Sequence, residues 1–586
     1  MSEEADVVRV AVAGGGLAGL TAALRLSQRG YQVTLYDDKP FLGGNAASHD
    51  HVHEDVHDGV YHDVYPHMYS NFYLNFWDIV ENDLGLRRDE SPRTDFEARN
   101  SFKFLRPGET QYRELRNAGS LSALWGNLFS GIAPPLDMYL WSYSMLDLLA
   151  HDFHKRGILS QSVNGYVRSR PCATERVAAL HDFVVMVIWS VHSTGTSVSS
   201  YRNFLLQAFG NLSPLLWLLK GSLETKIIQP WEKKLTDLGC KIHKQTRVEQ
   251  ISVDGGRISG MQVVHTDFEG QHHDVMPKGT LRPADPFDYL VLAVPPGPLG
   301  ELAGIGEPGH RIVDRLPQIA EARRLHSEPI AVLDLYFKRK LKGIPRENVV
   351  MGDSDIDLSI IDISQLWADE NMQDVTVLTL GASDYWALPS GIEEENAYLM
   401  IRKLNEYVPD FNPGAYWGDP DPRCDIDWER SHYQSNTDDV IFINQVGSWD
   451  WRPETHYRAI PNLFFAGDFC RNTIDMATAE AAVTSGLNAA IALQEEQPVG
   501  EPIGFLRPKT YPDGMLRAMK LMMAPSAYAA KWCTTAADAA SAASAGKPAE
   551  TVTNLVFMAR LPYVCAADWL ETAGAFWEYV FLGGRH

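Results

Sequence analysis

A glycine-rich turn near the N-terminus constrains the fold of this chain more than any other feature. An apolar run, Val8–Ala13, precedes the turn Gly14–Gly19, and Leu20–Gly30 follows with helical periodicity. With a second apolar run at Tyr31–Tyr36, the segment predicts a βαβ unit. In a GxGxxG turn the first glycine permits the tight bend, the second lets the backbone approach a pyrophosphate, and the third lets the helix pack closely on the strand. The turn residues expected to bind a dinucleotide are Gly14, Gly16, Leu17, Ala18 and Gly19.

An acid at the end of the second predicted strand completes the pattern. Asp37 follows Tyr36 directly, and a carboxylate at this position accepts hydrogen bonds from a ribose diol. Because strand, helix and acid stand in register, dinucleotide binding is a specific prediction. The motif alone does not distinguish NAD from FAD.

Composition and charge exclude several classes of protein. The chain has 586 residues, of which 45% are hydrophobic and 22% charged, the balance of a globular protein with several domains. Its net charge of −23 repels a phosphate backbone, so we expect no nucleic-acid partner. The cysteines have no CxxC spacing, which excludes a familiar zinc site. An acidic start and the lack of a long apolar run predict a cytoplasmic protein, with peripheral contact to a membrane as an alternative.

The segment after the second predicted strand resembles a known family. Asp38–Asn45 is similar to the E-x-x-x-x-x-G-G-[RK] stretch of the FAD-dependent superfamily that includes amine oxidases and carotenoid desaturases. In that family the double glycine lets the chain pass along the FAD pyrophosphate. Asn45 stands where the family has Arg or Lys, so the usual cationic contact is not expected from this position. The resemblance implies FAD contacts from Asp38, Gly43, Gly44 and Asn45.

The resemblance returns in the middle of the chain and near its C-terminal end. Pro461–Asp468 is similar to the second FAD signature of the family. Thr478–Gly486 looks like the helix start whose backbone N–H groups stabilise negative charge on the flavin. The resemblance implies non-covalent FAD binding, with further contacts from Val248, Ala293, Gly467, Asp468 and Ala479.

Nucleotide-domain patterns thus recur at the start, the middle and the end, which predicts discontinuous domains threaded by one chain. We expect an α/β fold with a Rossmann-like FAD-binding domain and a substrate domain of mixed β-sheet and helices. The FAD-binding domain is expected at residues 1–100, 205–300 and 440–497, the substrate domain at 101–204 and 301–439, and a C-terminal extension of unknown role at 498–586.

Within the superfamily the closest resemblance is to carotenoid desaturases of plant and cyanobacterial type. Val332–Leu341 looks like one of their strands, and Asp58–Asn71 resembles their segment beside the flavin. In that segment Tyr65 stands near an expected glycine and the spacing is shorter, so the active site is altered and the substrate need not be a carotene. The candidate active-site residues are Tyr65 and His67.

Six histidines crowd the same segment, at positions 49, 51, 53, 57, 62 and 67, among acidic residues. Imidazole and carboxylate suit zinc, iron or nickel, so a metal site is one interpretation. The resemblance favours another, because enzymes of this family need no metal there. We therefore expect no metal, and packing or active-site roles for these histidines.

The middle of the chain predicts a hydrophobic ligand, because residues 121–220 are rich in Leu, Trp, Phe and Tyr at helical spacing. We expect an FAD-dependent oxidoreductase that dehydrogenates an isoprenoid, polyene or fatty-acyl compound by hydride transfer to flavin N5. Oxygen or a quinone is the expected electron acceptor. The alternatives are an amine or amino-acid oxidase, a redox-neutral double-bond isomerase and a non-catalytic flavin-binding protein. The candidates for lining an apolar tunnel are Trp125, Trp141, Trp189, Trp217 and Trp231.

The C-terminal extension contains a methionine-rich helical pattern. One face of the predicted helix is apolar, whereas Arg517 and Lys520 lie off it. Such a face fits packing on the body of the protein or contact with a membrane surface, and we expect the packed arrangement. The apolar face holds Met515, Leu516, Met519, Met522 and Met523.

Overall fold

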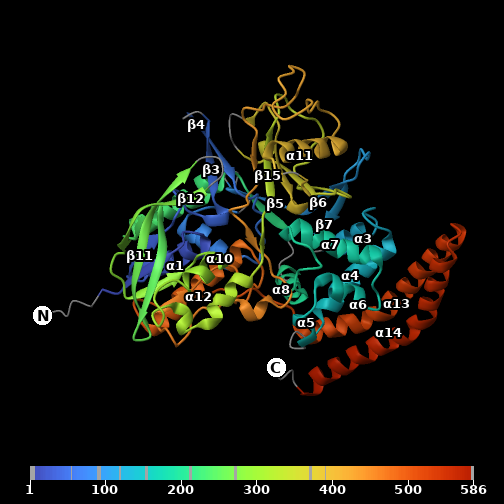
Figure 1. Ribbon diagram of the computed structural model, residues 1–586. Helices are drawn as coiled ribbons and strands as arrows, with labels where there is room; N and C mark the ends of the chain where they lie inside the picture. The colour runs from blue at the N-terminus through green and yellow to red at the C-terminus, as the bar shows by residue number, and fades with distance from the viewer. Residues whose placement is uncertain are drawn as a thin grey trace.

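The computed structural model places a parallel sheet, a mixed sheet and a group of helices side by side, with a long helical hairpin at one edge (Figure 1). The described residues are 7–53, 56–88, 94–117, 120–151, 156–209, 214–269, 274–367, 372–389 and 391–582. Within these ranges no helix is both long enough and apolar enough to cross a membrane.

The parallel sheet has five strands in the order β21-β13-β1-β2-β9. The central strand β1 is the one that leads into the glycine turn, so the turn emerges at the middle of the carboxyl edge. This arrangement confirms the predicted βαβ unit and the α/β fold class. The strands are β21 Leu463–Phe465, β13 Tyr289–Leu292, β1 Arg9–Ala13, β2 Gln32–Tyr36 and β9 Lys241–His243. These strands fall within the ranges expected for the FAD-binding domain, whose boundaries stay a prediction.

Two helices pack against this sheet, and against each other, through glycines. A Cβ on Gly19 would lie 1.9 Å from the carbonyl oxygen of Gly14, and one on Gly486 would lie 2.2 Å from the carbonyl oxygen of Ala18. Both contacts bring backbone against backbone, so neither position has room for a side chain. The helices are α1 Leu17–Gln28 and α12 Ala479–Glu496.

A seven-stranded mixed sheet follows, in the order β19-β15-β18-β17-β16-β6-β7. Strand β15 is buried along its whole length, because β18 and β19 flank it and both of its faces are covered. Leu333 and Leu335 pack towards helix α11, whereas Tyr336 packs in a separate apolar cluster. The elements are β6 Ser101–Leu105, β7 Arg113–Arg116, β15 Ala331–Tyr336, β16 Val349–Met351, β17 Leu358–Asp362, β18 Val377–Ala382, β19 His432–Gln434 and α11 Glu393–Tyr407.

Smaller sheets complete the β-structure. A tight turn at Gly255 and Gly256 joins β10 to β11, with Asp254 paired with Arg257. The three-stranded sheet holds β10 Thr246–Asp254, β11 Arg257–Glu269 and β12 Asp274–Pro283. The two-stranded pairs are β3 Ser48–His53 with β4 Val56–Asp63, β5 Phe96–Arg99 with β8 Leu216–Leu219, and β14 Ser327–Glu328 with β20 Ile441–Phe442.

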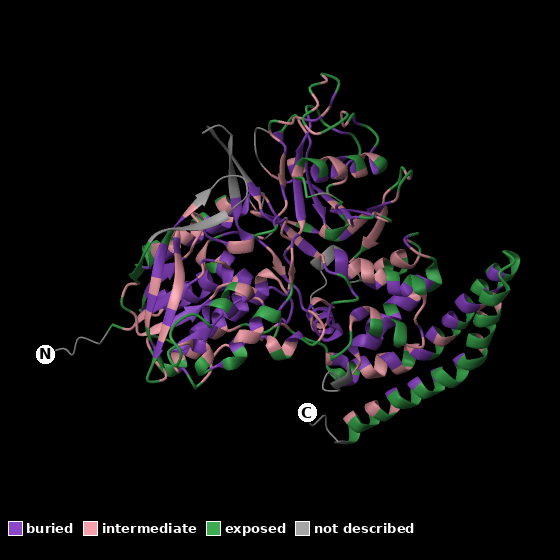
Figure 2. Ribbon diagram, in the orientation of Figure 1, coloured by how far each residue is buried: buried purple, intermediate pink, exposed green. Residues whose placement is uncertain are grey.

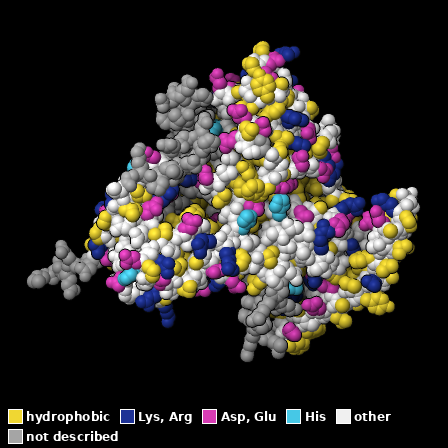
Figure 3. Space-filling model, in the orientation of Figure 1, with side chains coloured by type: hydrophobic (Ala, Val, Ile, Leu, Met, Phe, Trp, Pro, Cys, Tyr) yellow, Lys and Arg dark blue, Asp and Glu magenta, His cyan; other side chains and the backbone are white. Residues whose placement is uncertain are grey.

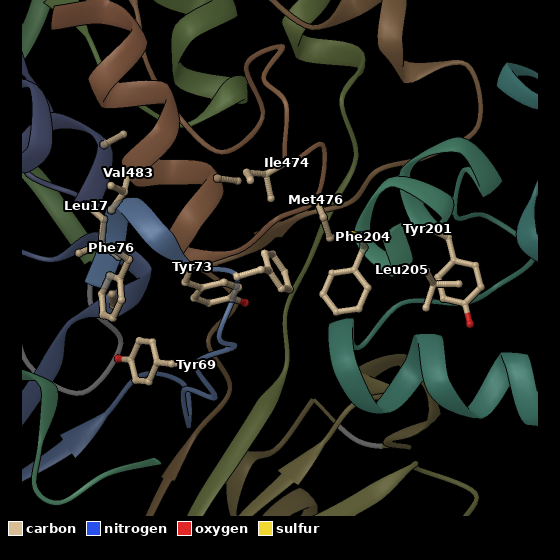
Figure 4. Packing of buried hydrophobic residues seen from close by; sticks show 14 of the residues in the cluster. Leu17, Tyr69, Tyr73, Phe76, Tyr201, Phe204, Leu205, Ile474, Met476 and Val483 are labelled. Atoms are coloured by element: carbon tan, nitrogen blue, oxygen red, sulfur yellow. The ribbon is translucent and has the colours of Figure 1, made fainter. Parts of the chain in front are cut away.

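Helices fill the region where the sequence predicts them, and one apolar core joins them to the parallel sheet. The ring of Phe72 meets that of Phe204 edge to face, 5.4 Å between centroids. Figure 4 shows Tyr73 and Phe204 in the same apolar layer as Leu17 and Val483. The helices of this region are α3 Leu121–Leu128, α4 Pro135–Leu149, α5 Arg156–Leu159, α6 Val163–Ser169, α7 Glu175–Trp189 and α8 Val198–Phe209. Elsewhere lie α2 Leu74–Asp78, α9 Gln229–Asp237 and α10 Pro296–Leu302.

The C-terminal extension is an antiparallel hairpin of α13, Asp513–Ser544, and α14, Pro548–Leu582 (red in Figure 1). Helix α13 packs on α4, and α14 packs on α13. Four buried charges hold the three helices together. Lys520 of α13 lies 2.7 Å from a carboxylate oxygen of Asp147 and 3.5 Å from one of Asp568, and Arg170 contacts both acids.

The packed arrangement expected for the methionine-rich helix is therefore present, but its predicted face is partly wrong. Lys520 is buried among charges instead of lying off the face, and Met522 is 74% exposed. Helical periodicity shows which residues share a face, but not which face meets a neighbour.

We expect Gly486→Ala to destabilise the protein, because its methyl group would collide with the carbonyl oxygen of Ala18. Overpacking of this kind typically costs about 1–3 kcal/mol. Thermal unfolding followed by circular dichroism should show a lower Tm. The control is Gly574→Ala in α14, where no atom lies within 4 Å of the added carbon and Tm should stay unchanged or rise slightly. An unchanged Tm for Gly486→Ala would contradict the close packing of α1 on α12.

Candidate functional site

A large cavity joins the carboxyl edge of the parallel sheet to the helical region. Its volume is about 1550 Å³, well above the roughly 300–1,000 Å³ of a pocket for one drug-sized ligand. Such a cavity has room for a dinucleotide and a second ligand. The predicted site residues that line it are Gly14, Gly16, Leu17, Ala18, Asp37, Asp38, Gly43, Gly44, Asn45, Tyr65, His67, Val248, Ala293, Gly467, Asp468 and Ala479. Gly19 lies against Gly14 instead, where it lets α1 pack on β1.

Two glycines of the turn have different roles. Gly14 has a φ of +105°, and a Cβ there would lie 2.3 Å from the carbonyl oxygen of Ala293, so the fold itself requires this glycine. A Cβ on Gly16 would meet only the carbonyl oxygen of Gly43 and the Cα of Gly44, each at 3.9 Å. Gly16 therefore borders open cavity space at the N-terminus of α1, where backbone N–H groups favour an anion. This is the cradle that the pyrophosphate of a dinucleotide needs.

Asp37 ties the turn to the end of β2. Its Oδ2 accepts the backbone N–H of Gly15 at 2.6 Å, and its Oδ1 accepts that of Lys39 at 2.9 Å. Burial, together with the neighbouring Asp38 carboxylate, raises the pKa of Asp37 to about 7. Each carboxylate oxygen has a second lone pair, so Asp37 can still accept a ribose hydroxyl. The structure places the acid at the cavity wall, and its ribose contact stays a prediction.

Two cationic side chains stand at this end of the cavity, although residue 45 is an uncharged asparagine. The side-chain amide of Asn45 donates to a main-chain carbonyl at 3.0 Å. Lys39 and Arg247 line the cavity, Lys39 paired with Asp439 and the Nε of Arg247 3.3 Å from Oδ2 of Asp38. Neither cation is among the predicted FAD contacts, although Lys39 lies within the Asp38–Asn45 stretch and Arg247 adjoins Val248. Both side chains carry the positive charge that suits a phosphate contact.

The N-terminus of α12 borders the cavity through Thr478 and Ala479. The Thr478 hydroxyl caps the helix by accepting the N–H of Ala481 at 3.1 Å. On the same side the N–H of Gly467 donates to the hydroxyl of Ser485 at 3.1 Å. A helix N-terminus carries partial positive charge, which suits the electron-rich ring of a reduced flavin. With the glycine cradle and the buried acid, this terminus fits FAD.

A buried ion pair shapes the loop between β21 and α12. Arg452 and Asp475 contact each other, each with 1% of its side chain exposed. Arg452 also donates from Nε to the carbonyl oxygen of Phe469 at 2.7 Å and from Nη2 to that of Cys470 at 3.0 Å. The loop holds Asp468 at the cavity wall, and burial raises the pKa of Asp468 to about 6. Nothing in the local sequence pattern predicts the Arg452 contact.

The opposite end of the cavity, here called the apolar arm, has walls from β6, α4, α7, α8 and α13. Of the tryptophans proposed for an apolar tunnel, Trp141 lines the cavity, whereas Trp231 is fully buried in the core and Trp125 is 66% exposed. Trp217 donates its indole N–H to Asn71 at 2.7 Å, and the side chain of Trp189 lies outside the described residues. Apolar side chains of the arm include Phe104, Trp141, Met145, Leu149, Phe183, Phe204, Leu205, Met519 and Met523.

Both candidate active-site residues line the cavity, and both are neutral near pH 7. Tyr65 is buried, its hydroxyl donates to the carbonyl oxygen of Asp439, and burial raises its pKa well above 10, so it stays neutral. The Nδ1 of His67 lies 2.7 Å from the carbonyl oxygen of Tyr65. Because a carbonyl can only accept, Nδ1 carries the hydrogen and Nε2 keeps a lone pair. Burial lowers the pKa of His67, which keeps the ring neutral near pH 7.

His67 also borders a second cavity of about 40 Å³. A water molecule occupies roughly 30 Å³ in the liquid, so this cavity has room for one. Asp63, Asp334 and Thr379 line this small chamber. Oδ1 of Asp63 accepts the hydroxyl of Ser48 at 2.6 Å, and burial raises the pKa of Asp63 to about 7. Asp63 is absent from the predicted site residues, although the desaturase segment that Asp58–Asn71 resembles has an acid at that position. A proton-holding group thus stands beside the histidine.

The histidine-rich segment is described in part. Among the described residues no three His, Cys, Asp or Glu side chains come together as a metal site. His62 is buried with its Nδ1 2.7 Å from a carboxylate oxygen of Asp334. The side chains of residues 49, 51, 53 and 57 lie outside the described part, so the expectation about a metal stays a prediction.

Gly16→Ala should reduce bound flavin without weakening the fold, because the added methyl group enters cavity space and meets no protein atom closer than 3.9 Å. We expect the flavin absorbance per mole of purified protein to fall, and the dissociation constant to rise by about tenfold or more. The Tm of the flavin-free form should match that of the flavin-free parent. Gly14→Ala is the contrasting variant, since its methyl group would collide with Ala293 and lower Tm in either form. Full flavin content in Gly16→Ala would contradict the cradle.

Asp63→Asn should become more stabilising as pH rises. Burial raises the pKa of Asp63 from 3.8 to about 7, so the folded protein holds a proton that the unfolded chain has released. Folding stability from this group is therefore lost as pH rises from about 4 to 7. Asparagine mimics the protonated acid, and its Oδ1 can still accept from Ser48.

The measurement is the Tm difference between Asp63→Asn and the parent from pH 5 to pH 8, which should increase up to about pH 7 and then level off. Asp314→Asn is the control, because Arg311 lowers the pKa of Asp314 and the acid is charged in both states across this range. A difference that does not change with pH at position 63 would exclude the raised pKa.

Solved structures of oxidases share this fold. Cyclohexylamine oxidase from Brevibacterium oxydans superposes with a TM-score of 0.54 and 13% identity, over 84% of this chain and 99% of that one. A putrescine oxidase double mutant superposes with a TM-score of 0.54 and 14% identity, over 83% of this chain and 100% of that one. An oxidoreductase from Methanosarcina mazei superposes with a TM-score of 0.52 and 12% identity, over 82% of this chain and 99% of that one. Similarity at this level of identity shows the fold alone.

Curated relatives match over short segments. A probable zeta-carotene desaturase from Synechococcus elongatus is 54% identical over 41 residues, which are 7% of this chain and 8% of the relative. A carotenoid phi-ring synthase from Streptomyces griseus is 56% identical over 39 residues, again 7% of this chain and 8% of the relative. The chain therefore matches less than a tenth of the length of either protein.

The family itself is shown by a longer match. The sequence profile of flavin-containing amine oxidoreductases covers residues 17–493, from the glycine turn to the end of α12. That range begins directly after Gly16 of the cradle and contains the buried acid and the helix N-terminus that fit FAD. The chain belongs to the family of flavin-containing amine oxidoreductases and is an FAD-dependent oxidoreductase.

Proposed function

We propose that this enzyme dehydrogenates a hydrophobic substrate, such as an isoprenoid, polyene or fatty-acyl compound, and forms a carbon–carbon double bond. The observation that carries the proposal is the apolar arm, which opens into the same cavity as the glycine turn. FAD, when bound, supplies the redox chemistry by accepting a hydride from a substrate C–H bond. The walls of the arm hold the chain of the substrate and exclude water. Oxygen or a quinone then takes the electrons.

His67 is the proposed base. Loss of a hydride from one carbon leaves a proton to be removed from the neighbouring carbon, if a double bond is to form. His67 is neutral, its bond to the carbonyl of Tyr65 leaves Nε2 with a lone pair, and the residue lines the cavity. Asp63, in the adjoining small chamber, can take this proton through a water when its carboxyl group is ionised, above about pH 7.

An amine or amino-acid oxidase is the second candidate, favoured by the solved oxidase structures. An ammonium group in an apolar site needs a carboxylate partner or an aromatic cage. The described residues that line the apolar arm include no Asp or Glu, which favours an uncharged substrate. The short matches to two carotenoid enzymes support the same choice.

Anaerobic titration of the purified holoenzyme tests the proposal. We expect polyenes, isoprenoids or fatty acids to bleach the flavin absorbance, and the product to contain one more double bond by mass spectrometry. Bleaching by amines alone would overturn the proposal in favour of the oxidase. If no compound bleaches the flavin, double-bond isomerisation of the same compounds separates an isomerase from a non-catalytic flavin-binding protein.

His67→Gln should slow substrate-dependent flavin reduction by about 10²-fold or more, since general bases contribute roughly 10²–10⁴-fold. In the parent, the reduction rate should be constant above about pH 6.5 and fall in acid, because the pKa of His67 is lowered from 6.5 and only the neutral ring accepts a proton. His310→Gln is the control, because His310 lies outside the cavity lining and bonds a main-chain carbonyl. Flavin content and Tm should match the parent in both variants. An unchanged rate in His67→Gln would remove the base from the proposal.

A further inference from the structure

The outer helix of the C-terminal hairpin presents a broad apolar face to solvent. The buried side of α14 consists of Leu561, Cys565, Asp568 and Thr572, and its chief neighbour is α13. Figure 2 shows exposed residues along most of α14, in contrast to the buried interior of the body. Figure 3 shows hydrophobic side chains along the outer edge of the hairpin.

Phe557 and Val564 apart, the exposed apolar residues of α14 share one side of the helix, here called the outer arc. With 3.6 residues per turn, they spread over about 140° of the helix circumference. Three of them are among the most exposed large apolar side chains of the described chain, with Tyr563 at 80%, Phe581 at 75% and Leu570 at 65%. The outer arc holds Val556, Tyr563, Trp569, Leu570, Trp577 and Phe581.

The charges of this helix lie at one edge of the outer arc. Arg560, Glu571 and Glu578 are exposed and fall within about 20° of one another on the helix circumference. Val564, also exposed, lies beyond them and outside the arc. A helix with a wide apolar side that includes Tyr and Trp, flanked by a line of charge, is suited to the boundary between water and lipid.

One end of the outer arc adjoins an opening of the cavity. Tyr511 and Met515, at the start of α13, line the cavity and are 39% and 46% exposed, so the cavity reaches the surface there. At the same place Gly514 packs against the ring of Tyr579, to which an added Cβ would come within 2.2 Å. Trp577 and Phe581 stand two residues to either side of Tyr579. An apolar compound leaving a lipid layer at this end of α14 would meet the cavity directly.

Charge favours a lipid surface over a second copy of the chain. Residues 501–586 hold eight Lys and Arg and seven Asp and Glu, which gives this segment a net charge of +1. The net charge of the whole chain is −23, so the residues before 501 carry −24. Pairing two copies through α14 would bring two strongly negative bodies together. A seam between two helices also needs a narrower apolar stripe than this arc.

We propose that the outer arc lies on the surface of a lipid bilayer, with α14 parallel to the membrane plane, and that the substrate enters the cavity from the lipid beside Tyr511 and Met515. The docking stands on the arc alone. The route of entry rests on the proposed function, because it requires a hydrophobic substrate.

Flotation of the full-length holoprotein with phosphatidylcholine vesicles, with and without phosphatidylglycerol, tests the docking. We expect the parent to float with the vesicles. Leu570→Glu and Trp577→Glu place a carboxylate at the centre of the arc and should weaken vesicle binding by about tenfold or more. Val564→Glu is the matched control, since it puts the same charge at an exposed apolar position outside the arc and should float like the parent. Equal flavin content and Tm in all variants would show that each is folded.

Two results would overturn the docking. One is a parent protein that floats with neither type of vesicle. The other is a loss of vesicle binding in Val564→Glu as large as that in Leu570→Glu. If sedimentation equilibrium instead shows a dimer that Leu570→Glu separates, the arc is an interface between two copies and not a membrane surface.

The entry route has its own readout. With substrate supplied from vesicles, Leu570→Glu should reduce the rate of flavin bleaching, whereas with substrate in detergent micelles the rate should equal that of the parent. If the parent and Leu570→Glu bleach the flavin at equal rates with substrate from vesicles, entry from the lipid is excluded. If substrate from neither vesicles nor micelles bleaches the flavin, the proposed function is wrong, and the flotation result is unaffected.

Discussion

Close approach of backbone to backbone at the carboxyl edge of β1 is the constraint on which the rest of the site depends. Gly19 packs on Gly14, and Gly486 packs on Ala18, so that β1, α1 and α12 meet without side chains between them. This approach brings two helix N-termini to the same cavity wall, one after the glycine turn and one at Ala479. Both favour negative charge, the first at a pyrophosphate and the second at the flavin ring.

The nucleotide end of the cavity could be predicted from the sequence because its determinants are local. A strand, a tight turn, a helix and a terminal acid lie within one short segment, and the turn conformation depends on the glycines themselves. Contacts between distant segments could not be predicted in this way. The ion pair of Lys39 with Asp439 and the contact of His62 with Asp334 join residues hundreds of positions apart, and no periodicity marks either.

The apolar end shows a different limit. Composition correctly indicated a large apolar interior in the helical region, but not which aromatic side chains face the cavity. Trp141 and Trp231 have the same chemistry, and only the first lines the arm because α4 borders the cavity and α9 does not. In the extension, Lys520 was placed off the apolar face, yet it is buried because Asp147 and Asp568 neutralise it. Charge pairing across three helices overrides the helical pattern of any one of them.

The buried charges between α4, α13 and α14 have a consequence for how the cavity recognises its ligand. Swinging α13 away from α4 would separate Lys520 from Asp147 and break a network in which Lys520 and Arg170 each contact both Asp147 and Asp568. The wall that α13 gives to the apolar arm is therefore a fixed partition rather than a moving flap. For a substrate of the proposed kind, a wall that keeps its place would hold the apolar chain in the same position in every catalytic cycle.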